Sequence, residues 1–301
     1  MICQAFVLIF FLISGYLFFK EGELTPRLYG VKLRRRCFSL LVPYIIWNSL
    51  AIGVMAVQER YLGGASERMG AIVDYQWKDW LYVFYDTSQS WNVTGPIGQP
   101  ANISLWFIRD LMILVILSPL FYAIAKIPKH LGLIILIAIY LIPYHLPHLN
   151  NSACFYFGLG TLMAVRNVDI APFASKYLWI FALLTLVLLG LYIGWENSYV
   201  LSIFRLSEVF FILGLTVKIL NMTTFRLPDI MNKSTFFIYA SHVIPTAALC
   251  YFVCRFLPHT ELVFMSCYLI IPIVVSFGLT AVYIVLQHLF PRFTSILTGG
   301  R

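Results

Sequence analysis

The sequence predicts an all-α, polytopic membrane protein, and three observations support this prediction. Of the 301 residues, 60% are hydrophobic and only 11% are charged, whereas soluble domains carry about 25% charged residues. The mean hydropathy is +0.84. Apolar runs close to the roughly 18–20 residues that cross about 30 Å of hydrocarbon recur along the whole chain. Since an unpaired backbone amide is costly in lipid, each of these runs must be helical.

We expect about nine transmembrane helices, because apolar segments follow one another with only one long interruption. They lie at approximately 2–19, 38–57, 105–125, 131–146, 152–165, 177–194, 199–220, 235–256 and 262–290. The fourth and fifth are short, as tilted or partly re-entrant helices are. No polar stretch is long enough to form a separate soluble domain, so residues 1–301 are interpreted as a single membrane domain.

The basic residues predict how the helices are oriented. One set of alternate loops holds nearly all of them: Lys20, Arg27, Lys32, Arg34, Arg35, Arg36, Lys126, Lys129, Arg166, Lys176, Lys218, Arg226, Lys233, Arg292 and Arg301. The opposite set holds only Arg60, Arg68, Lys78 and Arg255. Because Lys and Arg accumulate in cytoplasmic loops, the N-terminus is expected outside and the C-terminus in the cytoplasm. The net charge of +8 is explained by this asymmetry, and no nucleic-acid partner is expected.

The longest loop, 58–104, is predicted to be external and is rich in aromatic residues. Two interpretations stay open. In the first, the loop forms an interfacial belt or a helix lying on the membrane, because Trp and Tyr favour the headgroup zone. Flat aromatic faces also stack on sugar rings, which would make the loop a sugar platform. The aromatic residues are Tyr61, Tyr75, Trp77, Trp80, Tyr82, Phe84, Tyr85 and Trp91.

Cysteine and histidine residues do not predict a metal site. Most of the six cysteines lie in apolar segments, where Cys behaves as a small hydrophobe. Cys250 and Cys254 are one helical turn apart, but no second pair follows with zinc spacing. His145 and His148 lie between prolines without a third ligand and are interpreted as part of a solvated turn.

A basic cluster, Lys32, Arg34, Arg35 and Arg36, precedes the second apolar segment in what we interpret as a cytoplasmic loop. It is either a topological anchor or a phosphate clamp. The planar guanidinium group offers a fork of donors that matches phosphate oxygens. A nucleotide-bearing donor such as coenzyme A needs a clamp of this kind.

Small residues interrupt the first apolar segment at Ser14 and Gly15. Small side chains let helices approach closely, so helix packing is one interpretation. In the other, the Ser14 hydroxyl donates a hydrogen bond to a thioester or acyl carbonyl.

Arg109 and Asp110 open the third apolar segment, shortly after Trp106. A charged pair at the start of a membrane helix is expensive unless it is paired or hydrated. Since neighbours in a helix point about 100° apart, we expect the two side chains to find different partners. They either form an interfacial pair at the outer surface or, together with Trp106, line an external cavity that binds the substrate.

Three ionisable residues lie deeper in apolar segments. Arg205 and Glu208 are three residues apart, so they share a helical face and are expected to lie close enough to pair. Ionisable groups at this depth usually face a bundle interior or a cavity. His242 is either a hydrogen-bonded structural residue or a base that activates a hydroxyl.

Several motifs occur in an order that resembles a known family. These are FFLISGYLFFK, the basic cluster, LLVPYIIWN, LWFIRDL, FYFGLG and FIYASHVIP. Together they resemble acyltransferase type three, a family of membrane acyltransferases, over residues 6–290. The chain looks closest to the branch that O-acetylates bacterial exopolysaccharides and cell surfaces.

The resemblance implies about ten helices and a defined reaction. Family members take an acyl group, usually acetyl, from coenzyme A in the cytoplasm and pass it to a hydroxyl of a lipid-linked or surface glycan. Lys32, Arg34, Arg35 and Arg36 would hold the coenzyme A phosphates. The family often has a second arginine three residues after the first. Ser39 stands at that place here, so Lys32 or Arg35 would substitute.

The family's first helix carries an Arg and, about ten residues later, a His thought to be essential. Neither has a counterpart in this sequence, so we expect a chain truncated at its N-terminus relative to the family. The catalytic residue is thus unassigned, and His242, Glu208 and Arg205 are weak candidates.

The resulting prediction is an O-acyltransferase of the bacterial inner (cytoplasmic) membrane, with acetyl-CoA or another acyl-CoA as donor substrate and no permanently bound cofactor. Its expected partners are the acyl-CoA, a glycan or lipid-linked sugar, and membrane lipid. The alternatives are a polysaccharide or lipid transporter and an inactive truncated remnant. Against a transporter, the sequence has no internal repeat of the kind common in that class.

Overall fold

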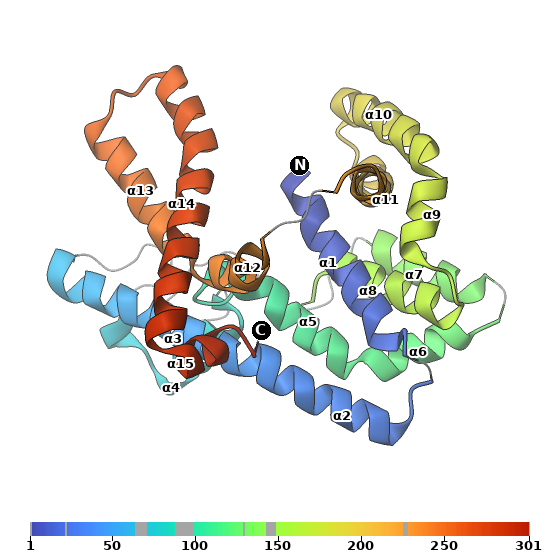
Figure 1. Cartoon of the computed structure of the whole chain (residues 1–301), viewed down its shortest axis with the longest axis horizontal. Coiled ribbons are helices and arrows are strands. Elements are labelled where there is room, and N and C mark those ends of the chain that lie inside the picture. Colours follow the sequence, from blue (N-terminus) through green and yellow to red (C-terminus); the bar gives the residue numbers. More distant parts are fainter. Residues whose placement is uncertain are drawn as a thin grey trace. The chain divides into compact units, whose positions relative to one another are not determined.

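The computed structural model describes residues 2–21, 23–63, 71–87, 99–128, 130–142, 149–224 and 228–300. Within these ranges the chain is helical and forms no strand, which confirms the predicted all-α class. Figure 1 shows the helices in chain order from α1 to α15. The buried side chains therefore pack between helices.

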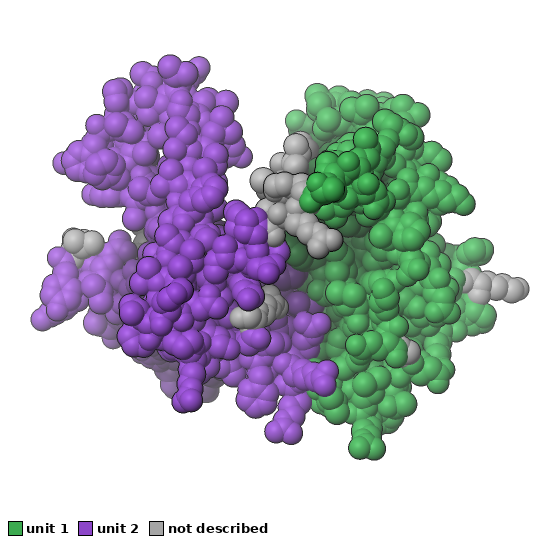
Figure 2. Space-filling model, viewed as in Figure 1, with its two compact units in different colours: residues 1–33, 113–226 green, residues 34–112, 227–301 purple. Residues whose placement is uncertain are grey.

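The helices form two compact units, each assembled from two separate stretches (Figure 2). Unit 1 comprises residues 1–33 and 113–226, and unit 2 comprises residues 34–112 and 227–301. Since both units combine early and late parts of the chain, each is completed only after more than two thirds of the sequence. The single membrane domain over residues 1–301 stays a prediction.

Unit 1 is built around α8 (Asn151–Val165), which is buried along nearly its whole length. The helix packs against α1 (Ile2–Phe19), α6 (Ser118–Lys126) and α7 (Leu131–Leu141) (Figure 1). The rest of the unit is α9 (Ile170–Lys176), α10 (Leu178–Trp195) and α11 (Ser198–Met222). Most of α10 is exposed apolar surface, as expected for a helix that faces lipid.

Two glycines let the backbones of α1 and α8 touch. A Cβ on Gly15 would lie 2.1 Å from the carbonyl oxygen of Phe157, and a Cβ on Gly160 would lie 2.0 Å from that of Leu12. Both distances are far below a van der Waals contact, so only glycine fits. Helix packing, one of the two interpretations of the Ser14–Gly15 pair, is therefore confirmed for Gly15.

Unit 2 begins within a long helical run. The helix α2 (Pro26–Arg36) continues through the π-helical turn η1 (Cys37–Leu41) into α3 (Val42–Gln58). The later helices of unit 2 are α12 (Asp229–Ser241), α13 (Val243–Phe256), α14 (Glu261–Leu289) and α15 (Pro291–Leu297). The interpretation of the basic cluster as part of a loop is wrong, because the cluster closes α2. Pro26 at the first helical position favours the start of this helix.

Two apolar segments are bent helix pairs. The pair α5 (Trp106–Ile116) and α6 turns by 60°, and the pair α12 and α13 turns by 65°. Pro119 and Pro245 follow these breaks. A proline ring clashes with the carbonyl four residues earlier and offers no amide hydrogen, so each proline ends the preceding helical run.

The described part of the chain contains four helices long and apolar enough to cross a membrane: Pro26–Tyr61, Leu178–Trp195, Ser198–Met222 and Glu261–Leu289. Each bent pair adds one span if it crosses as a unit, giving up to six. Three shorter apolar helices, Gln4–Phe19, Leu131–Leu141 and Asn151–Val165, account for the remaining predicted segments. The total of nine and the orientation stay predictions.

Candidate functional site

A charged pair is buried in unit 2 at the start of α5. Arg109 is 5% exposed and Asp110 is 1% exposed. The guanidinium group donates to Asp110 Oδ1 from Nη2 at 2.6 Å and from Nε at 3.0 Å. The expectation that these neighbours find different partners is therefore wrong. The long Arg side chain folds back along its own helix and spans the angle between the two Cβ directions.

The helix α4 (Trp77–Tyr85) supplies the other contacts of this pair. Arg109 Nη1 donates to the backbone oxygen of Tyr85 at 2.6 Å, and the guanidinium carbon lies 5.3 Å from the Tyr85 ring centre. Burial raises the pKa of the Tyr85 phenol above its ordinary value. Arg109 therefore faces a neutral aromatic ring, which is a favourable partner for a cation. A buried pair with these added hydrogen bonds is a rigid element of the site.

Trp106 begins α5 one turn before the charged pair and is half-buried. Residues three and four apart share a helical face, so Trp106, Arg109 and Asp110 lie on the same side of α5. The three residues predicted to bind substrate are thus brought together. Their contact with a substrate stays a prediction.

A chain of amide hydrogen bonds lies next to these residues in unit 2. The backbone amide of Asn102 donates to Asn48 Oδ1 at 3.0 Å, and Asn102 Nδ2 donates to the oxygen of Ala240 at 2.8 Å. Ser104 Oγ donates to Asn102 Oδ1 at 2.8 Å, and Tyr239 donates its phenol hydrogen to the oxygen of Ser104. Loop residue Asn102 therefore holds α3 and the end of α12 at once.

Neither Asn48 nor Asn102 was predicted as a functional residue from the sequence. Asn48 and Asn102 are 0% and 4% exposed, and a buried amide must be hydrogen-bonded. The sequence position of Asn48 could have revealed its role, because a side-chain amide within the apolar segment 38–57 needs a hydrogen-bond partner. Asn102 lies in a loop, where a polar residue is ordinary, so its role is visible only in three dimensions.

His242 occupies the break between α12 and α13 and is half-buried. Its Nδ1 lies 2.8 Å from the oxygen of Tyr239 and 3.3 Å from that of Ile238. Of the three weak catalytic candidates, it alone belongs to unit 2.

Arg205 and Glu208 belong to unit 1 and do not form the expected ion pair. Arg205 Nη2 donates to Gln4 Oε1 at 2.5 Å instead. Glu208 is 4% exposed, and its Oε2 has no hydrogen-bond partner among the described residues. The spacing correctly predicted that Arg205 and Glu208 share a helical face. The Arg205 guanidinium group nevertheless bonds to Gln4 on α1 instead of Glu208.

The basic cluster divides into two parts. Lys32 Nζ donates to the oxygen of Phe18, lies 3.5 Å from Glu21 and sits 5.2 Å from the Phe18 ring centre. It therefore caps the C-terminal end of α1, where a cation is favourable. Arg34 and Arg35 are exposed and Arg36 is half-buried. No hydrogen bond to another described residue occupies their guanidinium groups.

The aromatic loop 58–104 contains one described α-helix, α4, and Trp91 and residues 88–98 lie outside the described residues. On α4, Trp77 is 70% exposed and Trp80 is 43% exposed, while Asp79 and Val83 are buried. An amphipathic helix with exposed Trp fits both the interfacial and the sugar-stacking interpretations.

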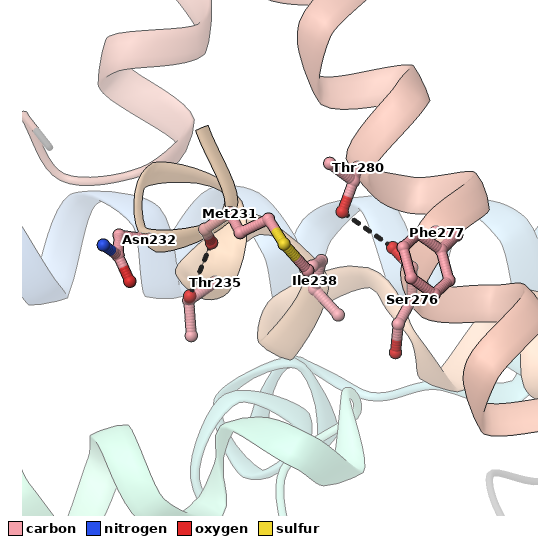
Figure 3. A pocket seen from close by; sticks show the side chains of 7 residues that line it. All are labelled: Met231, Asn232, Thr235, Ile238, Ser276, Phe277 and Thr280. Atoms are coloured by element: carbon pink, nitrogen blue, oxygen red, sulfur yellow. Dashed lines mark hydrogen bonds between the residues drawn. The ribbon is translucent and has the colours of Figure 1, made fainter. Parts of the chain in front are cut away.

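A shallow pocket of about 200 Å³ lies between α12 and α14 (Figure 3). It is lined by Met231, Asn232, Thr235, Ile238, Ser276, Phe277 and Thr280. The hydroxyls of Thr235, Ser276 and Thr280 donate to carbonyls four residues earlier in their own helices. These hydroxyls are already engaged, and the volume is below that of pockets which bury drug-sized ligands.

Within the described residues no three His, Cys, Asp or Glu side chains gather as a metal site would require. His145 and His148 lie outside those residues, so their interpretation as a solvated turn stays a prediction. Cys37, Cys154, Cys250, Cys254 and Cys267 are free thiols.

Comparisons with known proteins give the family. The profile of a family described as an acyltransferase domain matches residues 1–281. A succinoglycan biosynthesis protein, ExoH, of Rhizobium meliloti (strain 1021) is 29% identical over 191 residues, which cover 60% of this chain and 47% of that protein. The chain thus spans about half the length of this relative. No solved structure matches the chain. With its apolar helices the chain is an integral membrane protein, and it belongs to this acyltransferase family.

Proposed function

We propose that the chain transfers an acyl group, specifically acetyl, from coenzyme A to a hydroxyl of an exopolysaccharide or its lipid-linked precursor. The observation that carries this proposal is the family match over residues 1–281. The similarity to a succinoglycan biosynthesis protein supports a polysaccharide acceptor. The chain works in the inner membrane of a bacterium, with its N-terminus outside and its C-terminus in the cytoplasm.

The donor binds at the C-terminal end of α2. Arg34 and Arg35 are exposed, and their guanidinium groups are not used by the described part of the fold. They are therefore available to form bidentate bonds with phosphate oxygens of coenzyme A. Lys32 contributes differently, because its contacts with Phe18 and Glu21 fix the angle at which α2 leaves α1.

The acceptor binds near the start of α5. Trp106 offers a flat, half-buried ring, and the buried Arg109–Asp110 pair holds the start of α5 that carries this ring. Aromatic faces stack on sugar rings, so the Trp106 ring is the part of this element that contacts the acceptor. Holding donor and acceptor in one protein lowers the entropic barrier for the reaction between them.

Transfer in membrane vesicles tests this function. Inside-out vesicles from bacteria that express the chain receive radiolabelled acetyl-CoA and a lipid-linked polysaccharide precursor. We expect label in the glycan, released by mild base as an ester is. Vesicles without the chain provide the background. Labelling equal to that background with every acyl-CoA and glycan supplied would reject the proposal, and glycan flux without any donor would point to a transporter.

A further inference from the structure

The contacts of His242 determine which of its ring nitrogens carries the proton. Nδ1 lies 2.8 Å from the oxygen of Tyr239 and 3.3 Å from that of Ile238. Both neighbours are backbone carbonyls, which accept hydrogen bonds and never donate them. Nδ1 must therefore be the donor, and in the neutral ring Nε2 carries the free lone pair.

Other side chains hold the backbone that makes this contact. Asn102 Nδ2 donates to the oxygen of Ala240, and the Tyr239 phenol donates to the oxygen of Ser104. These bonds flank the helix break on which the ring sits. Asn102 itself is fixed from α3 by Asn48. The 65° turn between α12 and α13 frees the imidazole from the middle of a regular helix.

We propose that His242 is the base that deprotonates the acceptor hydroxyl, with Asn102 and Asn48 as positioning residues that hold its break in place. The proposal rests on the proposed acyl transfer. The hydroxyl proton passes to Nε2 while the hydroxyl oxygen forms a bond to the thioester carbonyl carbon. The carbon–sulfur bond then breaks, and the departing sulfur takes the proton from Nε2. Throughout, the Nδ1–H bond to Tyr239 is kept, so no tautomer change is needed.

His259 provides a matched control within the same unit. It lies in the exposed connection between α13 and α14, and its Nε2 is 2.8 Å from the oxygen of Cys254. By the same reasoning His259 carries its proton on Nε2 and its lone pair on Nδ1. The two imidazoles therefore have opposite tautomers.

Nitrogen-15 NMR of the full chain in detergent, with labelled histidine, tests the geometry without any activity. At a pH where the rings are neutral, we expect a protonated Nδ1 for His242 and a protonated Nε2 for His259. The two are assigned with the variants His242→Asn and His259→Asn. In Asn102→Ala, His242 should become a mixture of tautomers while His259 stays unchanged. A protonated Nε2 at His242 in the unmodified chain would overturn the proposal.

Acyl transfer by the same variants tests the chemistry. An Asn amide keeps a donor near the place of Nδ1 but has no basic nitrogen. His242→Asn should therefore lower kcat about 100-fold or more with little change in KM for acetyl-CoA, as loss of a general base does. His242→Gln should be equally impaired, and His259→Asn should match the unmodified chain. Asn102→Ala should lower kcat about tenfold.

The measurements distinguish failure of the base assignment from failure of the proposed acyl transfer. If the unmodified chain transfers acyl groups and His242→Asn retains more than a third of that rate, the base lies elsewhere. If the unmodified chain transfers nothing to any acceptor, the proposed function itself is rejected together with the base role, whatever the NMR spectra show.

Discussion

At the scale of single residues, the buried Arg109–Asp110 pair shows that each charge depends on its partner for stability. Each side chain is almost completely inaccessible, and a charge in such surroundings is tolerated only with its partner in place. Asp110 is the counter-ion that lets Arg109 reach the Tyr85 carbonyl. The pair therefore fixes α4 against the start of α5.

We predict that Asp110→Ala destabilises the chain by about 3–5 kcal/mol, because an uncompensated guanidinium group is left buried. Thermal unfolding in detergent, followed by circular dichroism, measures the loss. The double variant Arg109→Met, Asp110→Leu removes both charges and should recover most of the stability. A double variant as unstable as Asp110→Ala would show that the pair is not the cause.

Only those site residues that are neighbours in the sequence were predicted together. The motif around Trp106, Arg109 and Asp110 is contiguous, so its residues were found together. Asn102 bonds to Ala240, a residue 138 positions later in the chain. Such a contact depends on how loops and helix ends meet, and no spacing rule along the sequence encodes it.

At the scale of elements, contact between α1 and α8 depends on the absence of side chains. Gly15 and Gly160 touch the backbone of the opposite helix. In lipid, where helices gain little from hydrophobic burial against each other, close backbone approach is a principal source of association. The motifs ISG and GLG in the sequence predict small residues at an interface but not which helix receives them.

Gly15→Ala should destabilise unit 1, since its Cβ would lie 2.1 Å from the Phe157 oxygen and the helices must move apart. We expect a loss of about 2 kcal/mol or more, in the range for overpacking. The control is Gly190→Ala in α10, where nothing lies within 4 Å. It should gain about 0.5–1 kcal/mol from the better helix former. Denaturation in mixed detergent compares the two, and equal stability would refute the packing argument.

The exposed arginines at the end of α2 are predicted to contribute to donor binding and not to the chemical step. The double variant Arg34→Gln, Arg35→Gln should raise KM for acetyl-CoA at least tenfold and leave kcat nearly unchanged. Each charged hydrogen bond to phosphate contributes about 1.5–3 kcal/mol, and the phosphates do not take part in the reaction. Arg292→Gln in α15, which removes another exposed cation, is the control. Unchanged KM in the double variant would leave the cluster as a topological anchor only.

At the scale of the whole molecule, composition alone predicted an all-helical membrane protein, because 60% apolar residues cannot be buried from water in a chain of 301. The division into two units was not predicted. Each unit unites stretches more than 75 residues apart along the chain, 1–33 with 113–226 and 34–112 with 227–301. Hydropathy is a local property, so it locates helices and leaves their partners undetermined.

The proposed function requires that the end of α2 faces the cytoplasm, where it binds the acyl donor. Single cysteines placed in a cysteine-free variant measure this directly with a membrane-impermeant maleimide. Gly30 on α2 has open space around its Cα, and Val73 in the aromatic loop is 85% exposed. The cells are first made permeable at the cell envelope outside the inner membrane, which itself stays intact. We predict that Val73→Cys is then labelled, whereas Gly30→Cys reacts only after lysis. Labelling of Gly30→Cys in intact cells would place the arginines outside, where no coenzyme A reaches them, and would rule out this donor site.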